Sequence, residues 1–314
     1  MSDLPLLIHI GYPKTASSWL QADIFNNHNT GFCVPWLNQE GLCNKATDLF
    51  INCDVFSQQE AADFFLPPLE TTDKSLIPVL SNEFLSGCFF FTPPNYTPSL
   101  PEDIPARLHS VFPKAKVLIM IREQKSMLVS AYRQMLIMGH SLTIEEFINS
   151  GDKDITKHPT VGNLENLKFD ELIEKYQQVF TPDNVLVLPL EILVKDKINF
   201  FKILYNFLGS NQREISNEET KNVGLKGGKL TILRILNSPI SLLRNNSYLS
   251  SLIFRINYKI AEVADPFIPK QIHDAVEKKV KNYVKETVGT YYQESNQKTC
   301  QLIGIDLAKL GYTC

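Results

Sequence analysis

Short apolar runs, each followed by a segment with helical patterning, constrain the fold of this 314-residue chain more than any other feature. Three runs are clear, at residues 6–10, 116–121 and 185–190. The helical segments that follow them begin near residue 17 and span about 125–138 and 195–208. Such alternation is typical of parallel strands joined by right-handed crossover helices. The sequence therefore predicts an α/β fold with a central, mainly parallel sheet flanked by helices.

The rest of the chain adds less regular segments to this plan. A fourth run, residues 76–80, contains Pro78, which lacks an amide donor, so we expect this strand to be short or at an edge of the sheet. Residues 33–73 and 89–105 show no clear period and are expected to form loops and short helices. From about 230 to 314 the pattern is mostly helical, without a linker before it. We therefore expect one domain over residues 1–314.

Composition excludes several classes of protein. The net charge of −3 argues against a broad electrostatic nucleic-acid binder, which normally carries a basic excess. The six cysteines are scattered without a Cys-x-x-Cys pair, so neither a disulfide framework nor a metal site is predicted. No signal peptide and no bilayer-spanning apolar stretch is recognisable, so we expect a cytoplasmic protein without a transmembrane segment.

The sequence GYPKTASSW follows the first predicted strand and has the composition of an anion-binding turn. Gly11 permits a tight turn, and amides at a helix N-terminus attract oxyanions. Lys14 adds a full charge, while Thr15, Ser17 and Ser18 carry hydroxyl donors. The alternative is an ordinary strand-to-helix turn with a serine cap and a solvated lysine. The second glycine of the G-x-x-x-x-G-K-[ST] nucleotide-triphosphatase motif is missing, which disfavours Mg-ATP.

A second pair of polar residues follows the second clear strand. Arg122 ends the run VLIMI, and Ser130 follows eight residues later within the expected helix. An arginine fork and a hydroxyl can bind one phosphate between them. Taken alone, each residue is better explained by the alternative, a surface ion pair for Arg122 and a small helix residue for Ser130. Their joint occurrence with Lys14 favours the phosphate site.

The first of these stretches resembles a motif of the sulfotransferase family. GYPKTASSWL is similar to the family's 5′-phosphosulfate-binding loop, commonly G-x-P-K-[ST]-G-[ST]-[ST]-[WA]-L, with Ala16 where the family usually has glycine. Arg122 and Ser130 have the spacing of the family's 3′-phosphate-binding element. Late in the chain, NVGLKGGKL resembles the glycine-containing basic loop that closes over the 3′-phosphate, with Lys226 and Gly227 at the best-matching positions. Gly227 and Gly228 together would give a loop that can move.

The resemblance implies a three-layer fold like that of the P-loop nucleotide triphosphatases. It also implies transfer of a sulfuryl group from 3′-phosphoadenosine 5′-phosphosulfate (PAPS), leaving adenosine 3′,5′-bisphosphate (PAP), without a metal. Lys14 would stabilise charge on the leaving oxygen. The residues implied in donor binding are Gly11, Lys14, Thr15, Ala16, Ser17, Ser18, Trp19, Arg122, Ser130, Lys226, Gly227 and Gly228.

The acceptor needs a general base, and Glu83 is our candidate because it follows the fourth predicted strand. The alternative is an acidic residue at a helix N-terminus, with Ser81 or Asn82 as the cap. His9, within the first strand, is expected to be a core residue with its hydrogen bonds satisfied. Glu191, after the third clear strand, is expected to anchor the following segment rather than to belong to the site.

Two other classes of function stay open. One is a nucleotide-dependent kinase on a related fold, and the other is a non-catalytic nucleotide-binding relative. For the sulfotransferase, a small-molecule or glycan acceptor is expected, such as a carbohydrate, a lipid headgroup or a small alcohol. A homodimer is compatible with the sequence.

Overall fold

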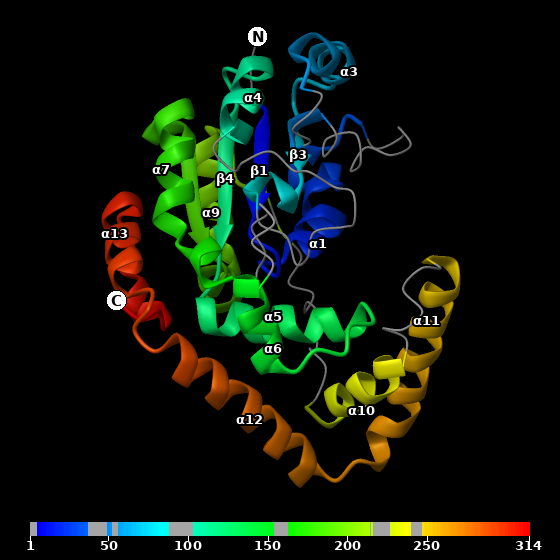
Figure 1. Ribbon diagram of the computed structural model, residues 1–314. Coiled ribbons are helices and arrows are strands. Elements are labelled where there is room, and N and C mark those ends of the chain that lie inside the picture. The colour runs from blue at the N-terminus through cyan, green and yellow to red at the C-terminus, as the bar shows by residue number, and fades with distance from the viewer. Residues whose placement is uncertain are drawn as a thin grey trace.

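A five-stranded parallel sheet forms the centre of the structure (Figure 1). Its strands are β1 (Leu7–Gly11), β2 (Phe32–Cys33), β3 (Ile77–Ser81), β4 (Lys116–Ile121) and β5 (Val185–Pro189), in the spatial order β2-β3-β1-β4-β5. Adjacent strands are parallel throughout the sheet. The structure is a computed structural model that describes residues 5–36, 49–51, 56–87, 103–153, 163–213, 215, 227–239 and 247–314.

Helices connect and cover the strands. Those with α-helical geometry are α1 (Ser17–Trp19), α3 (Gln58–Glu70), α4 (Asp103–Val111), α5 (Gln124–Ile137), α6 (Ile144–Lys153), α7 (Phe169–Phe180), α8 (Leu190–Lys195), α9 (Lys197–Leu208), α10 (Gly227–Asn237), α11 (Ser247–Ala264), α12 (Lys270–Val288) and α13 (Gln293–Ile303). The π-helical segment η1 (Leu20–Phe25) continues α1. The 3-10 segments are η2 (His28–Thr30), η4 (Glu83–Ser86), η5 (Leu164–Leu167), η6 (Pro182–Asn184), η8 (Asp265–Phe267) and η9 (Leu307–Leu310).

Strand β4 divides the interior into two apolar cores because successive side chains point to opposite faces of a sheet. Val117, Ile119 and Ile121 pack in one core with residues of α4, α5 and α7. Leu118 and Met120 pack in the other core with residues of η1 and α9. Helices therefore cover both faces of the parallel sheet (Figure 1), and the predicted three-layer α/β fold is confirmed.

Strand β3 corrects the expectation drawn from Pro78. The strand has five residues and lies between β2 and β1, rather than at an edge. Ile77 N donates to Gly31 O on the β2 side at 2.8 Å, whereas Asn82 N donates to His9 O on the β1 side at 3.2 Å. Backbone donors alternate between the two sides of a strand, so the nitrogen of Pro78 faces the β1 side. Pro78 precedes Val79, which pairs with Leu7, the first residue of β1, so β1 has not yet begun at the level of Pro78. The missing amide therefore removes no bond from the ladder between β3 and β1.

Helix α3 is a second departure, because the sequence between 33 and 73 was expected to contain only loops and short helices. The helix has 13 residues and starts after Ser57, whose hydroxyl accepts from Glu60 N at 3.2 Å. Pro67 and Pro68 lie near its end, where they obscure the helical period of the sequence. Helix α4 likewise begins at Asp103, inside the second segment expected to be irregular.

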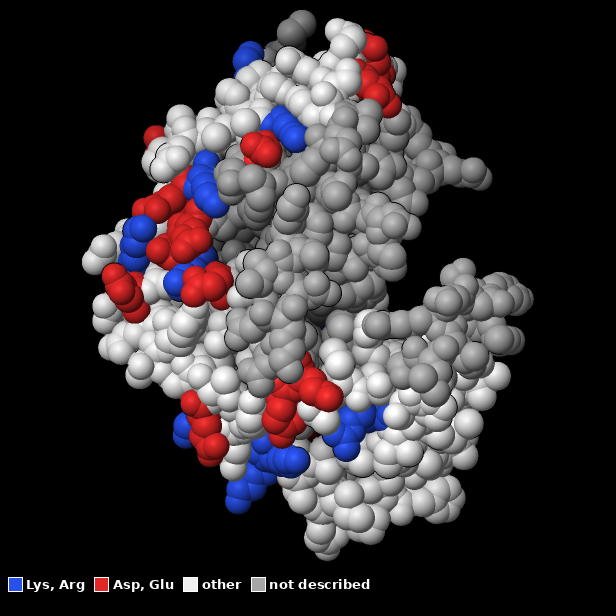
Figure 2. All heavy atoms as spheres, in the orientation of Figure 1, with Lys and Arg blue, Asp and Glu red and all other residues white. Residues whose placement is uncertain are grey.

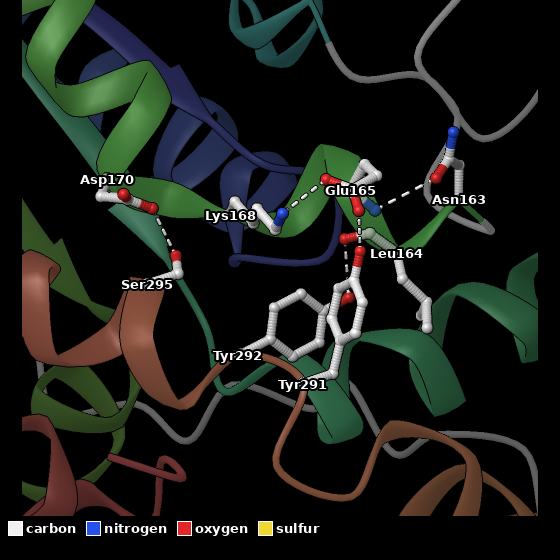
Figure 3. Close-up of polar contacts among 8 residues, drawn as sticks. All are labelled: Asn163, Leu164, Glu165, Lys168, Asp170, Tyr291, Tyr292 and Ser295. Atoms are coloured by element: carbon white, nitrogen blue, oxygen red, sulfur yellow. Dashed lines mark hydrogen bonds and ion pairs between the residues drawn. The ribbon is translucent and has the colours of Figure 1, made fainter.

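The helical part predicted near residues 230–314 is present as α10 to α13, and its last part is tied to η5 and α7 by polar contacts (Figure 3). Ser295 donates to Asp170, and Tyr291 donates to Glu165. Tyr292 Oη also donates to the carbonyl of residue 164 at 2.9 Å. These contacts join elements more than 100 residues apart in sequence, with separations of 125, 126 and 128.

Charged side chains of both signs are mixed on the surface over α7 and α13 (Figure 2). Lys298 illustrates this mixing, because its ammonium lies 3.4 Å from Asp170 Oδ2 and 2.9 Å from Glu174 Oε2. Within the described ranges, a helix both long enough and apolar enough to cross a bilayer is absent.

Candidate functional site

The candidate site lies where the carboxyl ends of β1, β3 and β4 meet. Tyr12 N, just after β1, donates to Met120 O of β4 at 3.1 Å, and Asn82 N, just after β3, donates to His9 O of β1 at 3.2 Å. These bonds bring the turns after three strands to one edge of the sheet. In open parallel sheets this edge is the usual place of ligand binding.

The turn after β1 folds back tightly over Gly11. A Cβ atom on Gly11 would lie 2.7 Å from Thr15 Oγ1 and 2.9 Å from Ser17 Oγ, distances at which side chains clash. Thr15 Oγ1 closes the turn by donating to Tyr12 O at 2.7 Å. The turn therefore requires glycine at position 11, and the Thr15 hydroxyl proton is used within the turn.

The backbone of this turn passes twice through the left-handed region. Lys14 has φ +72° and Ala16 has φ +69°. Each such residue other than glycine costs about 1 kcal/mol. In return, alternating backbone conformations turn successive amides toward one concave side, which is an anion-binding arrangement. The sulfotransferase motif usually has glycine where this chain has Ala16. The positive φ of this residue explains why glycine suits the position.

The Ser17 hydroxyl supports the same interpretation. Ser17 is buried, and among the described residues its Oγ has no hydrogen-bond partner. A buried polar atom without a partner is costly unless a ligand or water satisfies it. Ser18 is exposed. The orphaned hydroxyl, the cradle over Gly11 and the Lys14 charge together fit a phosphate or sulfate group.

Arg122 lies directly against this turn. Its Nη1 donates to the carbonyl oxygen of Lys14 at 3.1 Å, although the two residues are 108 positions apart. The Lys14 ammonium in turn donates to Gln134 Oε1 of α5 at 3.2 Å. Gln134 follows Ser130 by four residues, so both lie on the same face of α5. The structure therefore brings Lys14, Arg122 and the Ser130 face of α5 together.

Gln134 was not predicted as a site residue. A glutamine in the middle of a helix carries no distinguishing signal by itself. Its position four residues after Ser130, on the face already assigned to a phosphate, is the only sequence feature that pointed to it.

Glu83 is the first residue of η4, and its carboxylate interacts with the charge of Lys14. Burial raises the pKa of the Glu83 carboxyl, while the charge of Lys14 acts in the opposite direction. Burial lowers the pKa of the Lys14 ammonium, and the charge of Arg122 lowers it further, whereas the charge of Glu83 raises it. The alternative interpretation also has support, because the Asn82 side chain caps η4 by accepting from Phe84 N at 2.9 Å. Glu83 is thus both the first residue of a capped helix and a partly buried carboxylate near Lys14.

Arg122 is charged in a partly buried setting. The largest effect on the pKa of its guanidinium is burial, which lowers it. Glu191 and Glu123 raise this pKa, and nearby Arg133 lowers it. Arginine nevertheless stays protonated in proteins. A half-buried cation of this kind favours an anionic partner.

His9 differs in part from the expected core residue. It is fully buried, and its Nδ1 shares a hydrogen bond of 2.7 Å with Ser81 Oγ. Ser81 Oγ also accepts from Gln21 Nε2 at 3.0 Å. Within the described part of the chain, however, His9 Nε2 has no partner. Burial lowers the pKa of His9 to about 3, so the imidazole is neutral.

The remaining predicted donor-binding residues lie in other surroundings. Trp19 packs edge-on against Phe201, with ring centroids 6.2 Å apart, and Lys197 lies over its ring. Gly227 and Gly228 were expected in a movable loop, but they form the first turn of α10 and are buried. A Cβ on Gly227 would lie 2.4 Å from His273 O of α12, so close helix packing explains this glycine. Lys226 lies outside the described residues.

Among the described residues, no group of three or more His, Cys, Asp or Glu side chains is placed to hold a metal ion. The described cationic groups at the site include Lys14 and Arg122, with Arg133 close to Arg122.

Comparisons with known proteins give solved structures only. No protein-family model and no curated protein matches the sequence. A sulfotransferase from Alicyclobacillus acidocaldarius is similar at 15% identity and a TM-score of 0.49, covering 79% of this chain and 98% of that one. The sulfotransferase domain from the curacin biosynthetic pathway is similar at 12% identity and a TM-score of 0.42, covering 66% and 74%.

Mouse sulfotransferase SULT7A1, solved in complex with PAP, is similar at 14% identity and a TM-score of 0.37, covering 67% of this chain and 60% of that one.

Proposed function

We propose that this chain is a sulfotransferase that moves a sulfuryl group from PAPS to a hydroxyl or amine of an acceptor. A carbohydrate, a lipid headgroup or a small alcohol fits this chemistry. One observation carries the proposal: Arg122 Nη1 lies 3.1 Å from the carbonyl of Lys14, so the two predicted phosphate-binding elements meet at one place. A donor with phosphates at both ends of an adenosine needs two such elements within reach of each other.

The residues at the site fit the two ends of this donor. We assign the amides and hydroxyls of the turn, with Gly11 and Ser17 at its centre, to the 5′-phosphosulfate. Arg122 and Ser130 are assigned to the 3′-phosphate, since an arginine fork binds phosphate oxygens in pairs. The third element, residues 226–228, stays a prediction.

Bound PAPS supplies an activated sulfur whose bond to the bridging oxygen breaks as a new bond to the acceptor oxygen or nitrogen forms. The departing PAP gains negative charge at the bridging oxygen. We assign Lys14 to this charge, because a positioned cation in a partly buried site stabilises developing charge strongly. Gln134 orients the ammonium through its 3.2 Å hydrogen bond.

The proton of the acceptor goes to Glu83 in this proposal. Burial raises the pKa of this carboxyl, which makes it a stronger base than an exposed glutamate. The opposite charge of Lys14 lowers this pKa and so favours the ionised form of the carboxyl. We therefore assign the proton-accepting role to Glu83.

Binding of PAP, measured by calorimetry, tests the donor assignment. We expect the wild-type protein to bind PAP without metal, and Lys14→Ala to weaken binding by about tenfold or more, as for loss of a charged hydrogen bond. Lys114→Ala, at an exposed lysine, is the control and should bind PAP like the wild type. Binding of Mg-ATP without binding of PAP would indicate the kinase instead.

Release of PAP from PAPS in the presence of monosaccharides, primary alcohols and phenols tests the base. Glu83→Gln should lower turnover by roughly 100-fold or more while PAP affinity stays within about twofold. Glu60→Gln, also in the first turn of a capped helix, should change neither quantity. PAP binding by the wild type with no PAPS consumption over the whole panel would leave a non-catalytic nucleotide binder.

A further inference from the structure

Tyr312 and Thr313 lie close to the residues that directly follow Arg122, although they are far away in sequence. Thr313 Oγ1 accepts from Lys125 Nζ at 2.7 Å. The carbonyl of Thr313 accepts from Asn296 Nδ2 at 2.9 Å, and Asn296 Oδ1 accepts from Gln124 Nε2 at 2.7 Å. Gln124 and Asn296 are buried, so this network lies in the interior.

Tyr312 extends the network to the backbone next to Arg122. Its hydroxyl donates to Glu191 Oε2 at 3.0 Å. The other oxygen of this carboxylate, Oε1, accepts from the backbone nitrogen of Glu123 at 3.0 Å. Glu191 therefore bridges Tyr312 and the peptide unit that joins Arg122 to Glu123.

The Glu191 bridge between Tyr312 and the backbone next to Arg122 lies where its hydrogen bonds can stay fixed. The Tyr312 side chain is buried, so water competes little for the Glu191 oxygen. The Glu123 side chain also stabilises this turn by accepting from Lys125 N at 3.0 Å and Ser126 N at 2.7 Å. The turn after β4 thus has hydrogen bonds from two carboxylates, those of Glu191 and Glu123.

The bridge also acts on Arg122 through charge. The carboxylate of Glu191 is the largest favourable charge acting on the pKa of the guanidinium, ahead of Glu123. Arg133 acts in the opposite direction, and its own charge is paired with Glu277. Glu191 therefore both anchors the Arg122 backbone and keeps a negative charge beside the guanidinium.

We propose that Tyr312 and Glu191 are positioning residues that hold Arg122 toward the 3′-phosphate of the donor. This inference rests on the proposed function. Neither residue needs to contact the donor, because both act through the backbone and charge of Arg122. Their effect is therefore specific to the 3′-phosphate.

The test compares PAP with adenosine 5′-monophosphate (AMP), which lacks the 3′-phosphate. In Tyr312→Phe the ring is kept and only the hydrogen bond to Glu191 is lost. We expect the PAP dissociation constant to rise about fivefold and that of AMP to stay within about twofold. Glu191→Gln, which keeps the size of the side chain and removes its charge, should show the same selective loss.

Tyr291→Phe is the matched control, because Tyr291 also donates to a glutamate, Glu165, from the same part of the chain (Figure 3). It should bind both nucleotides like the wild type. Unchanged PAP binding in Tyr312→Phe and Glu191→Gln, or equal loss of PAP and AMP binding, would overturn the positioning role. If the wild type itself binds PAP no better than AMP, the proposed function fails at the 3′-phosphate, and the inference fails with it.

Discussion

Two residues in the turn after β1 adopt a conformation that their side chains disfavour. Lys14 and Ala16 both have positive φ, at +72° and +69°. Such strain persists where the surrounding structure fixes it and is common at binding sites. Here the turn is fixed by the bond from Thr15 Oγ1 to Tyr12 O. The strain is consistent with a turn shaped for an anion rather than for stability.

Ala16→Gly tests the strain at the residue itself. Glycine adopts positive φ freely, so we expect the free energy of unfolding to rise by about 0.5–1 kcal/mol, even after the greater entropy of the unfolded chain. Urea denaturation measures this change, with the m-value unchanged. The matched control is Ala131→Gly within α5, which should lower the free energy of unfolding by about 1 kcal/mol. A loss of stability in Ala16→Gly would contradict the strained geometry.

At the scale of elements, β1, β3 and η1 are joined below the turn by a polar chain of three residues. His9 shares a hydrogen bond of 2.7 Å with Ser81, which accepts from Gln21 at 3.0 Å. Since the imidazole is buried and neutral, its protonation opposes folding. The joint between these elements should therefore be sensitive to acid.

The sign of this effect follows from the pKa of His9, which is about 3 in the folded protein and 6.5 for the unperturbed group. Below pH 6.5 the unfolded chain takes up a proton that the folded chain refuses, so stability falls with pH until the folded pKa is reached. From pH 7.5 to 5 we expect His9 to contribute a loss of roughly 2 kcal/mol.

Urea denaturation of the wild type and His9→Gln at both pH values measures this contribution. His9→Gln should lose about 2 kcal/mol less than the wild type between pH 7.5 and 5. Substitution of His28, which is exposed, by glutamine provides the control and should leave the loss as in the wild type. Equal losses in the wild type and His9→Gln would show that His9 is not held neutral.

Most strands and their crossover helices could be predicted because apolar runs and helical periods are local signals. The strand at Lys116–Ile121 is predicted to the residue, and α1, α5 and α9 begin within two residues of the predicted positions. The short helix α8, which directly follows β5, was not predicted. The place of each strand in the sheet could not be predicted so well. Pro78 indicated a strand that is short or at an edge, because the sequence does not show that the proline nitrogen faces β1 at a level before β1 begins.

For the whole molecule, the predicted site residues that meet are those at strand ends. The sequence placed Lys14, Glu83 and Arg122 after separate strands, and parallel sheets bring such ends together. Gln134 and Tyr312 could not be predicted in the same way, and Glu191, although it follows a strand, was expected to lie outside the site. Their contacts span 120 residues for the Lys14–Gln134 pair and 121 for the Glu191–Tyr312 pair, and no local pattern carries such pairings.

In the proposed complex, one donor molecule lies between the turn after β1 and the guanidinium after β4. A crystal structure of the protein with PAP tests this arrangement. We expect the 5′-phosphate on the amides of residues 14–18 and the 3′-phosphate on Arg122 and Ser130. A structure in which PAP contacts only one of these two elements, or lies elsewhere on the protein, would contradict it.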